Sequence, residues 1–269
     1  MLRRHPVAFT LLLLGGVAML LPLALMFSMS LMDPSDIYNL SLWPTSPTLE
    51  NYLYLLTEKG FGRWFLNSFI VSLGTTASVL FFDTLVGYTL AKFRFAGRGI
   101  VFIAILSTLM IPTEMLVIPW YVMARTLGWL DTLWGVAFPG IMTGFGTFLM
   151  RQFFLDVPDD LLDAARIDGL GEFAIFRRVA VPLVRPALSA LAILVFLGNW
   201  TAFLWPLIAT TSPDRYTLPV GLASLQGEFQ TDWAMIMTGS ALATLPTLIV
   251  FLLLQRHIVN GIALTGLKA

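Results

Sequence analysis

The chain has 269 residues, of which 57% are hydrophobic and 12% are charged, and its mean hydropathy is +0.82. This composition excludes an ordinary water-soluble domain and indicates a membrane protein. The formal net charge of zero argues against nucleic-acid binding, which needs a basic surface, and a chain without cysteine has neither disulfides nor thiolate metal sites.

Six apolar runs, each of a length that can cross a bilayer as a helix, follow one another along the sequence. We therefore expect an all-α, polytopic membrane protein that forms a single transmembrane domain over residues 1–269. The expected spans are residues 7–31, 64–91, 100–123, 132–150, 182–209 and 233–254.

The first run follows Arg3 and Arg4, as in a secretory signal peptide, but it is too long for one and lacks a cleavage site. We expect it to remain as a spanning helix. The segments between the spans include a polar loop at 33–63, which ends in a short amphipathic piece, and a second polar loop at 210–232. The residues after the last span, 255–269, are expected to form a tail.

Lysine and arginine are unequally divided between the two sides of such a protein. If the N-terminus is cytoplasmic, only Lys59, Arg63, Arg125 and Arg215 lie on the far side, and the other twelve of the sixteen lie inside. Because loops rich in Lys and Arg stay in the cytoplasm, both termini and the 156–181 loop are expected there. The twelve are Arg3, Arg4, Lys92, Arg94, Arg98, Arg151, Arg166, Arg177, Arg178, Arg185, Arg256 and Lys268.

The longest polar interlude is the 156–181 loop, between the fourth and fifth runs. Pro158 suits the first position of a helix, and the acidic Asp159 suits its first turn, where the helix dipole favours negative charge. Gly169 can take the left-handed conformation that ends a helix. We expect one helix between these residues and a second short helical turn over 172–178.

Leu161, Ala164, Ala165 and Asp168 fall on one face of the first of these helices. A face of small side chains lets a helix sit deep in a groove on another protein, with acidic residues around it to pair with basic groups. The alternative is a helix that lies flat on lipid. That arrangement usually has Lys and Arg on the polar face, whereas this helix carries acidic residues, so we favour docking.

Several residues of this loop follow the spacing of a known motif. They are Asp163, Ala164, Ala165, Asp168, Gly169, Phe176, Pro182 and Pro186. The pattern resembles the "EAA" loop of the membrane subunits of binding-protein-dependent ABC importers. It differs at two positions, with Asp163 where the family usually has Glu and Leu170 where it usually has Ala, and the first change shortens the reach of the carboxylate.

The resemblance covers nearly the whole chain and points to the carbohydrate-uptake branch, in particular to the second permease subunit of maltose and glycerol-phosphate type importers. The further motifs are Asn51-Tyr52, Asn67-Ser68, Gly87-Tyr88 with Ala91-Lys92-Phe93, Ile118-Pro119-x-Tyr121, and Gly261 with Thr265-Gly266-x-Lys268.

This resemblance implies a type I ABC importer permease fold with six transmembrane helices and a cytoplasmic coupling helix. The implied partners are a second permease in a heterodimer, a cytoplasmic ATPase dimer and an extracytoplasmic solute-binding protein, all at the cell membrane. The residues implied in coupling to the ATPase are Asp163, Ala164, Ala165, Asp168, Gly169 and Phe176.

The sequence offers no catalytic constellation of its own. The closest approach to a phosphate-binding loop, at 261–268, has a Leu between Gly and Lys and no Ser or Thr after it, so we expect ATP to be bound by a partner subunit and no cofactor here. With His5 and His257 as its only histidines, both at the ends of spans, the chain is expected to hold no metal and not to be a membrane-embedded enzyme.

Polar residues within the spans are candidates for the solute path. Asn199 and Trp200 form a pair suited to a sugar, because an aromatic face packs on C–H groups while an amide binds hydroxyls; the alternative is that both serve in helix packing. Asp83 could line the path, but its role stays open. Glu114, beside Pro112, is better explained as a cap on a broken helix.

An ion-coupled secondary transporter is the alternative function. It would have two similar halves with paired broken helices, and we find no convincing repeat between residues 1–140 and 141–269. The sequence does not identify the solute.

Overall fold

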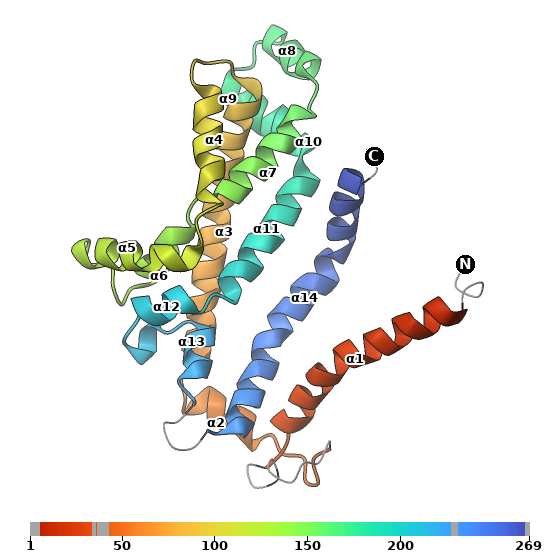
Figure 1. The fold of residues 1–269 in the computed structure, drawn as a ribbon, viewed down its shortest axis with the longest axis vertical. Helices are drawn as coiled ribbons and strands as arrows, with labels where there is room; N and C mark the ends of the chain where they lie inside the picture. Colours follow the sequence, from red (N-terminus) through yellow and green to blue (C-terminus); the bar gives the residue numbers. More distant parts are fainter. Residues whose placement is uncertain (1–5, 34–35, 37–42, 227–230, 267–269) are drawn as a thin grey trace. The chain divides into compact units, whose positions relative to one another are not determined.

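The computed structural model describes residues 6–33, 36, 43–226 and 231–266, and its regular elements within these ranges are helices (Figure 1). Both chain ends, with Arg3, Arg4 and Lys268 of the orientation argument, lie outside the described residues. The chain forms two compact units, Met1–Phe65 with Leu218–Leu248 and Leu66–Thr217 with Ile249–Ala269. Two long helices, α3 (Phe61–Lys92) and α14 (Trp233–Gly266), each contribute to both units.

The first unit contains α1 (Pro6–Ser30), α2 (Glu50–Thr57), α13 (Leu218–Ala223) and the first part of α14. Side-chain hydrogen bonds join its helices. The hydroxyl of Ser30 lies 2.6 Å from that of Tyr52, and the Thr238 hydroxyl donates to the backbone oxygen of Ser30 at 3.1 Å. Asn51 donates to the backbone of Met32 at 2.7 Å, so the Asn51-Tyr52 motif connects α2 to the end of α1.

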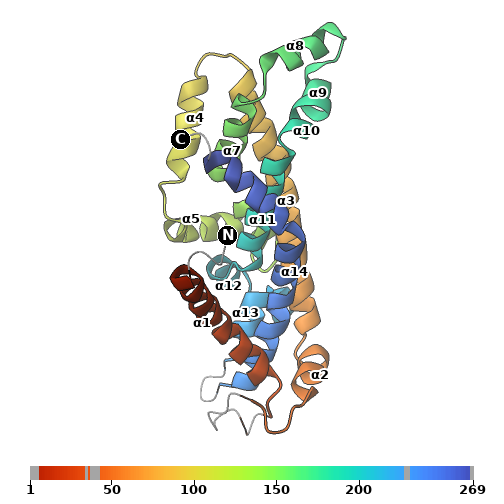
Figure 2. The same ribbon diagram turned by 90° about the vertical axis from the view of Figure 1, so that its right-hand side faces the viewer.

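The second unit is built on four helices, α3, α4 (Arg98–Thr108), α7 (Gly144–Leu155) and α11 (Arg185–Trp200) (Figures 1 and 2). Gly87 permits a close approach of α3 to α7, because a Cβ there would lie 2.8 Å from both Met150 Cβ and Arg151 N on α7. Next to this contact Tyr88 is the centre of an aromatic core.

The other elements of this unit lie between these four helices or follow the last of them. Those between them are α5 (Thr113–Thr126), α6 (Leu133–Ala137), the 3₁₀ turn η3 (Phe138–Gly140), α8 (Asp159–Ile167), α9 (Glu172–Ile175), the π-helical turn η4 (Phe176–Ala180) and α10 (Val181–Leu183). After α11 come α12 (Leu204–Ala209) and the 3₁₀ turn η5 (Pro213–Arg215).

Three of the expected spans are not single straight helices. The chain bends by 98° between α4 and α5, by 44° between the α6–η3 segment and α7, and by 82° between α10 and α11. Pro112 explains the first bend, since it precedes α5 and disfavours helical conformation in the residue before it. The expected span 100–123 therefore ends as a straight helix at Thr108, and α5 runs in a different direction.

Other expected boundaries also change. The fourth run continues to Leu155, the fifth begins its straight part at Arg185 and breaks after Trp200, and the 210–232 loop contains α13. The α14 helix continues through most of the expected tail to Gly266, and the division of the chain into a last span and a tail at 255–269 stays a prediction. The amphipathic piece before the second span is confirmed as α2.

Within the described residues, α1 and α3 are long and apolar enough to cross a bilayer as single helices, and three bent pairs would raise the number to five. The part of α14 from Trp233 to Ile249 is a shorter apolar helix. An all-helical, multi-pass architecture is confirmed, and six spans stay a prediction.

Candidate functional site

Two features of the second unit are candidates for function: the segment around α8, and a cavity bordered by α4, α5, α7 and α12. Figures 1 and 2 show α8 beyond the ends of α3 and α7, with α5 and α12 at the other end of the same unit.

The predicted helix at the start of the 156–181 loop is confirmed as α8. Pro158 has φ −63° and ψ 132°, so the helix begins at Asp159, one residue later than expected. It ends in a Schellman motif, in which Gly169 N donates to Arg166 O at 3.0 Å and Leu170 N to Ala165 O at 3.1 Å. Gly169 has φ +83°, a conformation in which a Cβ is unfavourable. The second turn continues through α9, η4 and α10 to Leu183.

Lys92, at the C-terminal end of α3, holds the start of α8. Its side chain is 6% exposed, and Nζ donates to Asp159 Oδ1 and to Val157 O, both at 2.6 Å. The hydrogen bond from the Lys92 ammonium, with its charge, lowers the pKa of Asp159 below the usual range for a carboxyl group. Asp159 itself is 73% exposed, so this ion pair orients the helix more than it stabilises the fold.

Arg166 holds the other end of α8. Its guanidinium forms two hydrogen bonds with the Glu172 carboxylate, at 2.7 and 3.2 Å, and a third with Asp163. The hydrogen bonds that Arg166 donates to the carboxylates of Glu172 and Asp163 raise its pKa. The turn between α8 and α9 is therefore closed by a bidentate pair, and the Asp163 carboxylate is engaged within its own helix.

The inward face of α8 differs from the sequence expectation. Leu162 is fully buried, and Ala165 is 7% exposed because it packs into the core of the unit. Ala164 is exposed, so Ala164 and Ala165 do not lie on one outward face. Consecutive side chains of an α-helix are separated by a rotation of about 100° around its axis. The outward side consists of Asp160, Leu161, Asp163, Ala164, Ile167 and Asp168, and Ile167 is 86% exposed.

Phe176 also lies inside the fold. Its ring centroid is 5.1 Å from that of Tyr88 and 6.4 Å from that of Phe154. Because it is buried, any effect of Phe176 on a partner must pass through the packing of α9 and η4 against α3 and α7.

A cavity of about 610 Å³ lies at the other end of the second unit, which is within the range of small-molecule sites. Uncharged side chains form its wall, with several hydroxyls, one amide and two indoles among the apolar groups. The polar and aromatic members are Thr108, Thr113, Trp120, Thr143, Thr147, Asn199, Trp205 and Thr217.

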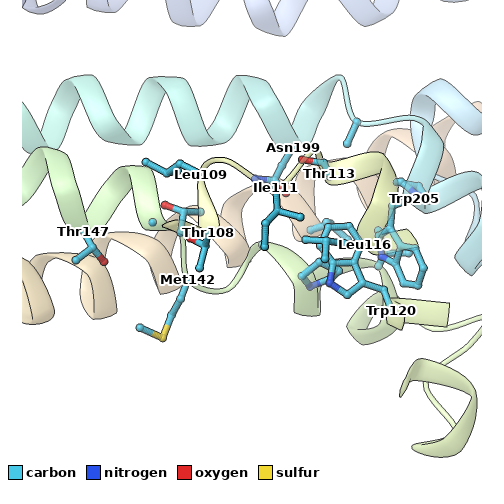
Figure 3. A pocket seen from close by; sticks show the side chains of 18 of the residues that line it. Thr108, Leu109, Ile111, Thr113, Leu116, Trp120, Met142, Thr147, Asn199 and Trp205 are labelled. Atoms are coloured by element: carbon cyan, nitrogen blue, oxygen red, sulfur yellow. The ribbon is translucent and has the colours of Figure 1, made fainter. Parts of the chain in front are cut away.

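The indoles occupy one end of the cavity, with Asn199 towards its middle and Thr147 at the opposite end of the view (Figure 3). Trp205 donates from Nε1 to Gly135 O at 3.0 Å, and the Trp120 ring meets it edge-on, with centroids 5.7 Å apart. Asn199 Nδ2 donates to Val195 O at 2.9 Å. A Cβ at Gly140 would lie 3.2 Å from Asn199 Oδ1, so this glycine keeps the wall beside the amide open.

The three residues expected on the solute path are not brought together. Asn199 lines the cavity, whereas Trp200 is 3% exposed and stacks on Phe196, with centroids 5.8 Å apart and ring planes at 15°. Asp83 is fully buried on α3 and accepts hydrogen bonds from Thr143 N at 3.0 Å and Thr143 Oγ1 at 2.7 Å. It fixes the residue that precedes α7, and Glu114 is exposed in the first turn of α5.

Sequence analysis missed both indoles of the cavity, Trp120 and Trp205. The bend after Pro112 turns α5 by 98° relative to α4, and this places a tryptophan from the third apolar run beside Trp205 of α12. The signal in the sequence was Pro112 followed by Pro119-Trp120, which predicts a break but not its direction.

Comparison with known proteins gives consistent matches. Residues 83–263 match the family model described as "Binding-protein-dependent transport system inner membrane component". The Arabinooligosaccharides transport system permease protein AraQ of Bacillus subtilis (strain 168) is 39% identical over 231 residues, which cover 86% of this chain and 82% of that protein. The sn-glycerol-3-phosphate transport system permease protein UgpE of Brucella abortus (strain 2308) is 32% identical over 280 residues, covering 98% and 99%.

Among solved structures, a chain from a bacterial ABC transporter involved in the import of the acidic polysaccharide alginate superposes with a TM-score of 0.85. The match covers 95% of this chain and 96% of that chain at 23% sequence identity, so it supports the fold alone.

Proposed function

The chain belongs to the family of binding-protein-dependent transport system inner membrane components, and from this premise we propose that it is one of two permease subunits of an ABC importer for a sugar or a related polar solute. The family assignment favours this function over an ion-coupled secondary transporter. In the proposed importer, ATP is bound and hydrolysed by a separate cytoplasmic ATPase dimer, and an extracytoplasmic binding protein delivers the solute.

The observation that carries the proposal is the exposed side of α8. Lys92 and Arg166 hold the two ends of this helix, and its outward side presents Ala164 and Ile167 among acidic residues. An isolated helix of nine residues is marginal in water. Here the rest of the fold holds such a helix at both ends, and its exposed side has apolar side chains surrounded by acidic ones. This surface is suited to a groove with basic groups on another protein.

The excess of Lys and Arg supports a topology of six spans with both termini and α8 in the cytoplasm, on the ATPase side. In this topology α8 is the coupling helix, with Asp163, Ala164, Asp168 and Gly169 forming or shaping its docking surface. Ala165 and Phe176 support that surface from inside the fold.

At the other end of the unit, the cavity supports a role in solute passage for only one of the three predicted path residues. This residue is Asn199, which lines the cavity. Asp83 and Trp200 contribute by fixing α7 and by packing on Phe196.

Replacing Ala164 by Trp tests the docking surface. The side chain is exposed, so the Ala164→Trp subunit should assemble with its partner permease, but a bulky ring on a docked face should clash with the ATPase groove. We expect weak ATPase retention in the purified complex and little ATP-driven uptake. A helix that lies on lipid would instead accept the Trp.

Gly171→Trp is the matched control, because Gly171 lies in the same loop beyond the end of α8 and a Cβ there meets no atom within 4 Å. Retention and uptake should remain close to those of the unmodified complex. If Ala164→Trp also left both unchanged, α8 would not be the docking element.

A further inference from the structure

The wall of the cavity is polar without being charged. Its twenty-one lining residues include five threonines and one asparagine, together with the indoles of Trp120 and Trp205, and none is Asp, Glu, Lys, Arg or His. Threonine hydroxyls and an amide can donate and accept hydrogen bonds, and an aromatic ring presents a negative face to C–H groups. These are the groups that match a polyhydroxylated ring.

Thr217 supplies an independent sign of a ligand. Its side chain lines the cavity and is 3% exposed, yet its Oγ1 has no hydrogen-bond partner among the described residues. A buried hydroxyl without a partner is unfavourable. The Oγ1 atom is not itself exposed to the cavity, but rotation about χ1 would turn it to the cavity wall, where a polar molecule can bind it.

The N-termini of α5 and α7, the two longer helices that begin at the cavity, are unsuited to an anion. Helix N-termini attract phosphate and carboxylate groups when their N–H groups are free. At α7 the Thr143 hydroxyl already accepts from Gly146 N, and the Asp83 carboxyl group lies behind it. At α5 the first turn contains Glu114. A negatively charged group of a solute at either helix N-terminus would lie near Asp83 or Glu114. The cavity wall has no cation to balance the charge of such a solute.

We propose that this cavity is a binding site, within this subunit, for an uncharged saccharide or polyol, and that it disfavours phosphorylated and carboxylated solutes. The aromatic end formed by Trp120 and Trp205 packs on a ring of the solute, and Asn199 and Thr217 bind its hydroxyls. This inference rests on the proposed function, and it distinguishes between the neutral and anionic solutes for which the relatives are named.

Thr217→Val tests the hydroxyl. The substitution keeps the shape of the side chain and removes an unsatisfied group, so the thermal stability of the purified complex should stay the same or rise. Removing a hydrogen bond to the solute should raise the KM for uptake of arabinotriose by about two- to tenfold. Thr84→Val is the matched control, because Thr84 is also buried with an unpartnered Oγ1 but does not line the cavity. Equal KM values for the two variants would overturn the proposal.

The site itself is tested by labelling, since the chain has no native cysteine. In the complete importer, Leu109→Cys places a thiol in the cavity wall, and Ser107→Cys places one on the same helix away from it. We expect arabinotriose to slow alkylation of the first thiol and not the second. Glycerol 3-phosphate and an alginate trisaccharide should protect neither.

The outcomes separate the two proposals. If the complex carries out ATP-driven uptake of arabinotriose but Leu109→Cys is not protected, or is protected equally by the anions, the proposed site is wrong and the permease function stands. If α8 variants leave ATPase retention and uptake unchanged, the coupling proposal is wrong whatever the labelling shows.

Discussion

At the α8 end of the second unit ion pairs lie near the surface, whereas at the cavity end carboxyl groups bind backbone N–H groups. Lys92 binds Asp159, and Arg166 binds Glu172, and the two carboxylate side chains are 73% and 45% exposed. At the other end Asp83 accepts from Thr143, and Asp131 accepts from Thr211 N and Ser212 N, each at 2.9 Å. The hydrogen bonds that Ser212 donates, first of all from its hydroxyl, lower the pKa of Asp131.

The difference agrees with what each end is proposed to bind. A surface ion pair contributes little to stability, but several of them fix the direction of a short helix and leave other charges available to a protein partner. If the cavity lies within the membrane and binds a solute, as proposed, an acidic group facing that solute would be costly and would exclude anions. There the carboxyl groups cap the chain instead, and the wall is left to hydroxyls, an amide and indoles.

The largest effect is expected from a substitution at the C-terminal end of α8. Gly169→Leu forces a Cβ into φ +83°, which costs of the order of 1 kcal/mol or more and disrupts the Schellman motif. We expect the variant to insert and pair normally but to lose most ATPase retention and most uptake. Both are measured on the complex purified through its partner permease.

Gly171→Leu separates strain from bulk. Neither glycine has an atom within 4 Å of an added Cβ, but Gly171 has an ordinary φ of −71°. The Gly171 variant should transport almost normally. Equal losses in both would mean that the loop tolerates no larger side chain, and that the left-handed conformation is not the cause.

A smaller effect is expected where α3 meets α8. Lys92→Met keeps the length of the apolar stem but removes the charge, which leaves the backbone oxygen of the buried Val157 without its donor at a cost of about 1–3 kcal/mol. The start of α8 should then be less well held. We expect the ATPase to remain bound and the ratio of solute imported to ATP hydrolysed to fall several-fold.

Asp159→Asn serves as the comparison. The amide keeps an oxygen for Lys92 and the site is exposed, so the coupling ratio should change by no more than about twofold. If Asp159→Asn were as harmful as Lys92→Met, the charge pair would matter more than the hydrogen bond to Val157.

The sequence was sufficient for features that depend on neighbouring residues. The ends of α8 were predicted from Pro158, Asp159 and Gly169, because dipole and conformational preferences act over one turn. The inward direction of Ala165 could not be predicted in this way, since it depends on what Leu162 packs against. Trp120 was missed for a similar reason: Pro112 predicts a break in the helix, but not the direction of the 98° bend that brings Trp120 to Trp205.

The smallest effect is expected from a substitution of Asp83, which tests the role of the carboxyl group at the cavity end. Asp83→Asn removes the charge and keeps one oxygen for Thr143 N, but the Thr143 hydroxyl loses the acceptor that it now meets at 2.7 Å. One hydrogen bond to a charged group is worth about 1.5–3 kcal/mol, and the retained oxygen offsets part of that loss. The thermal midpoint of the purified complex should therefore fall slightly, while the KM for arabinotriose and its preference over glycerol 3-phosphate stay the same.

Asp83→Leu provides the contrast, because leucine offers Thr143 no acceptor at all. It should lower the thermal midpoint further and reduce the amount of assembled complex, again without a change of preference in the molecules that assemble. A changed solute preference in Asp83→Asn at an unchanged thermal midpoint would contradict a capping role. It would mean that the Asp83 carboxyl group faces the solute, and that acidic groups face a binding partner at both ends of the unit.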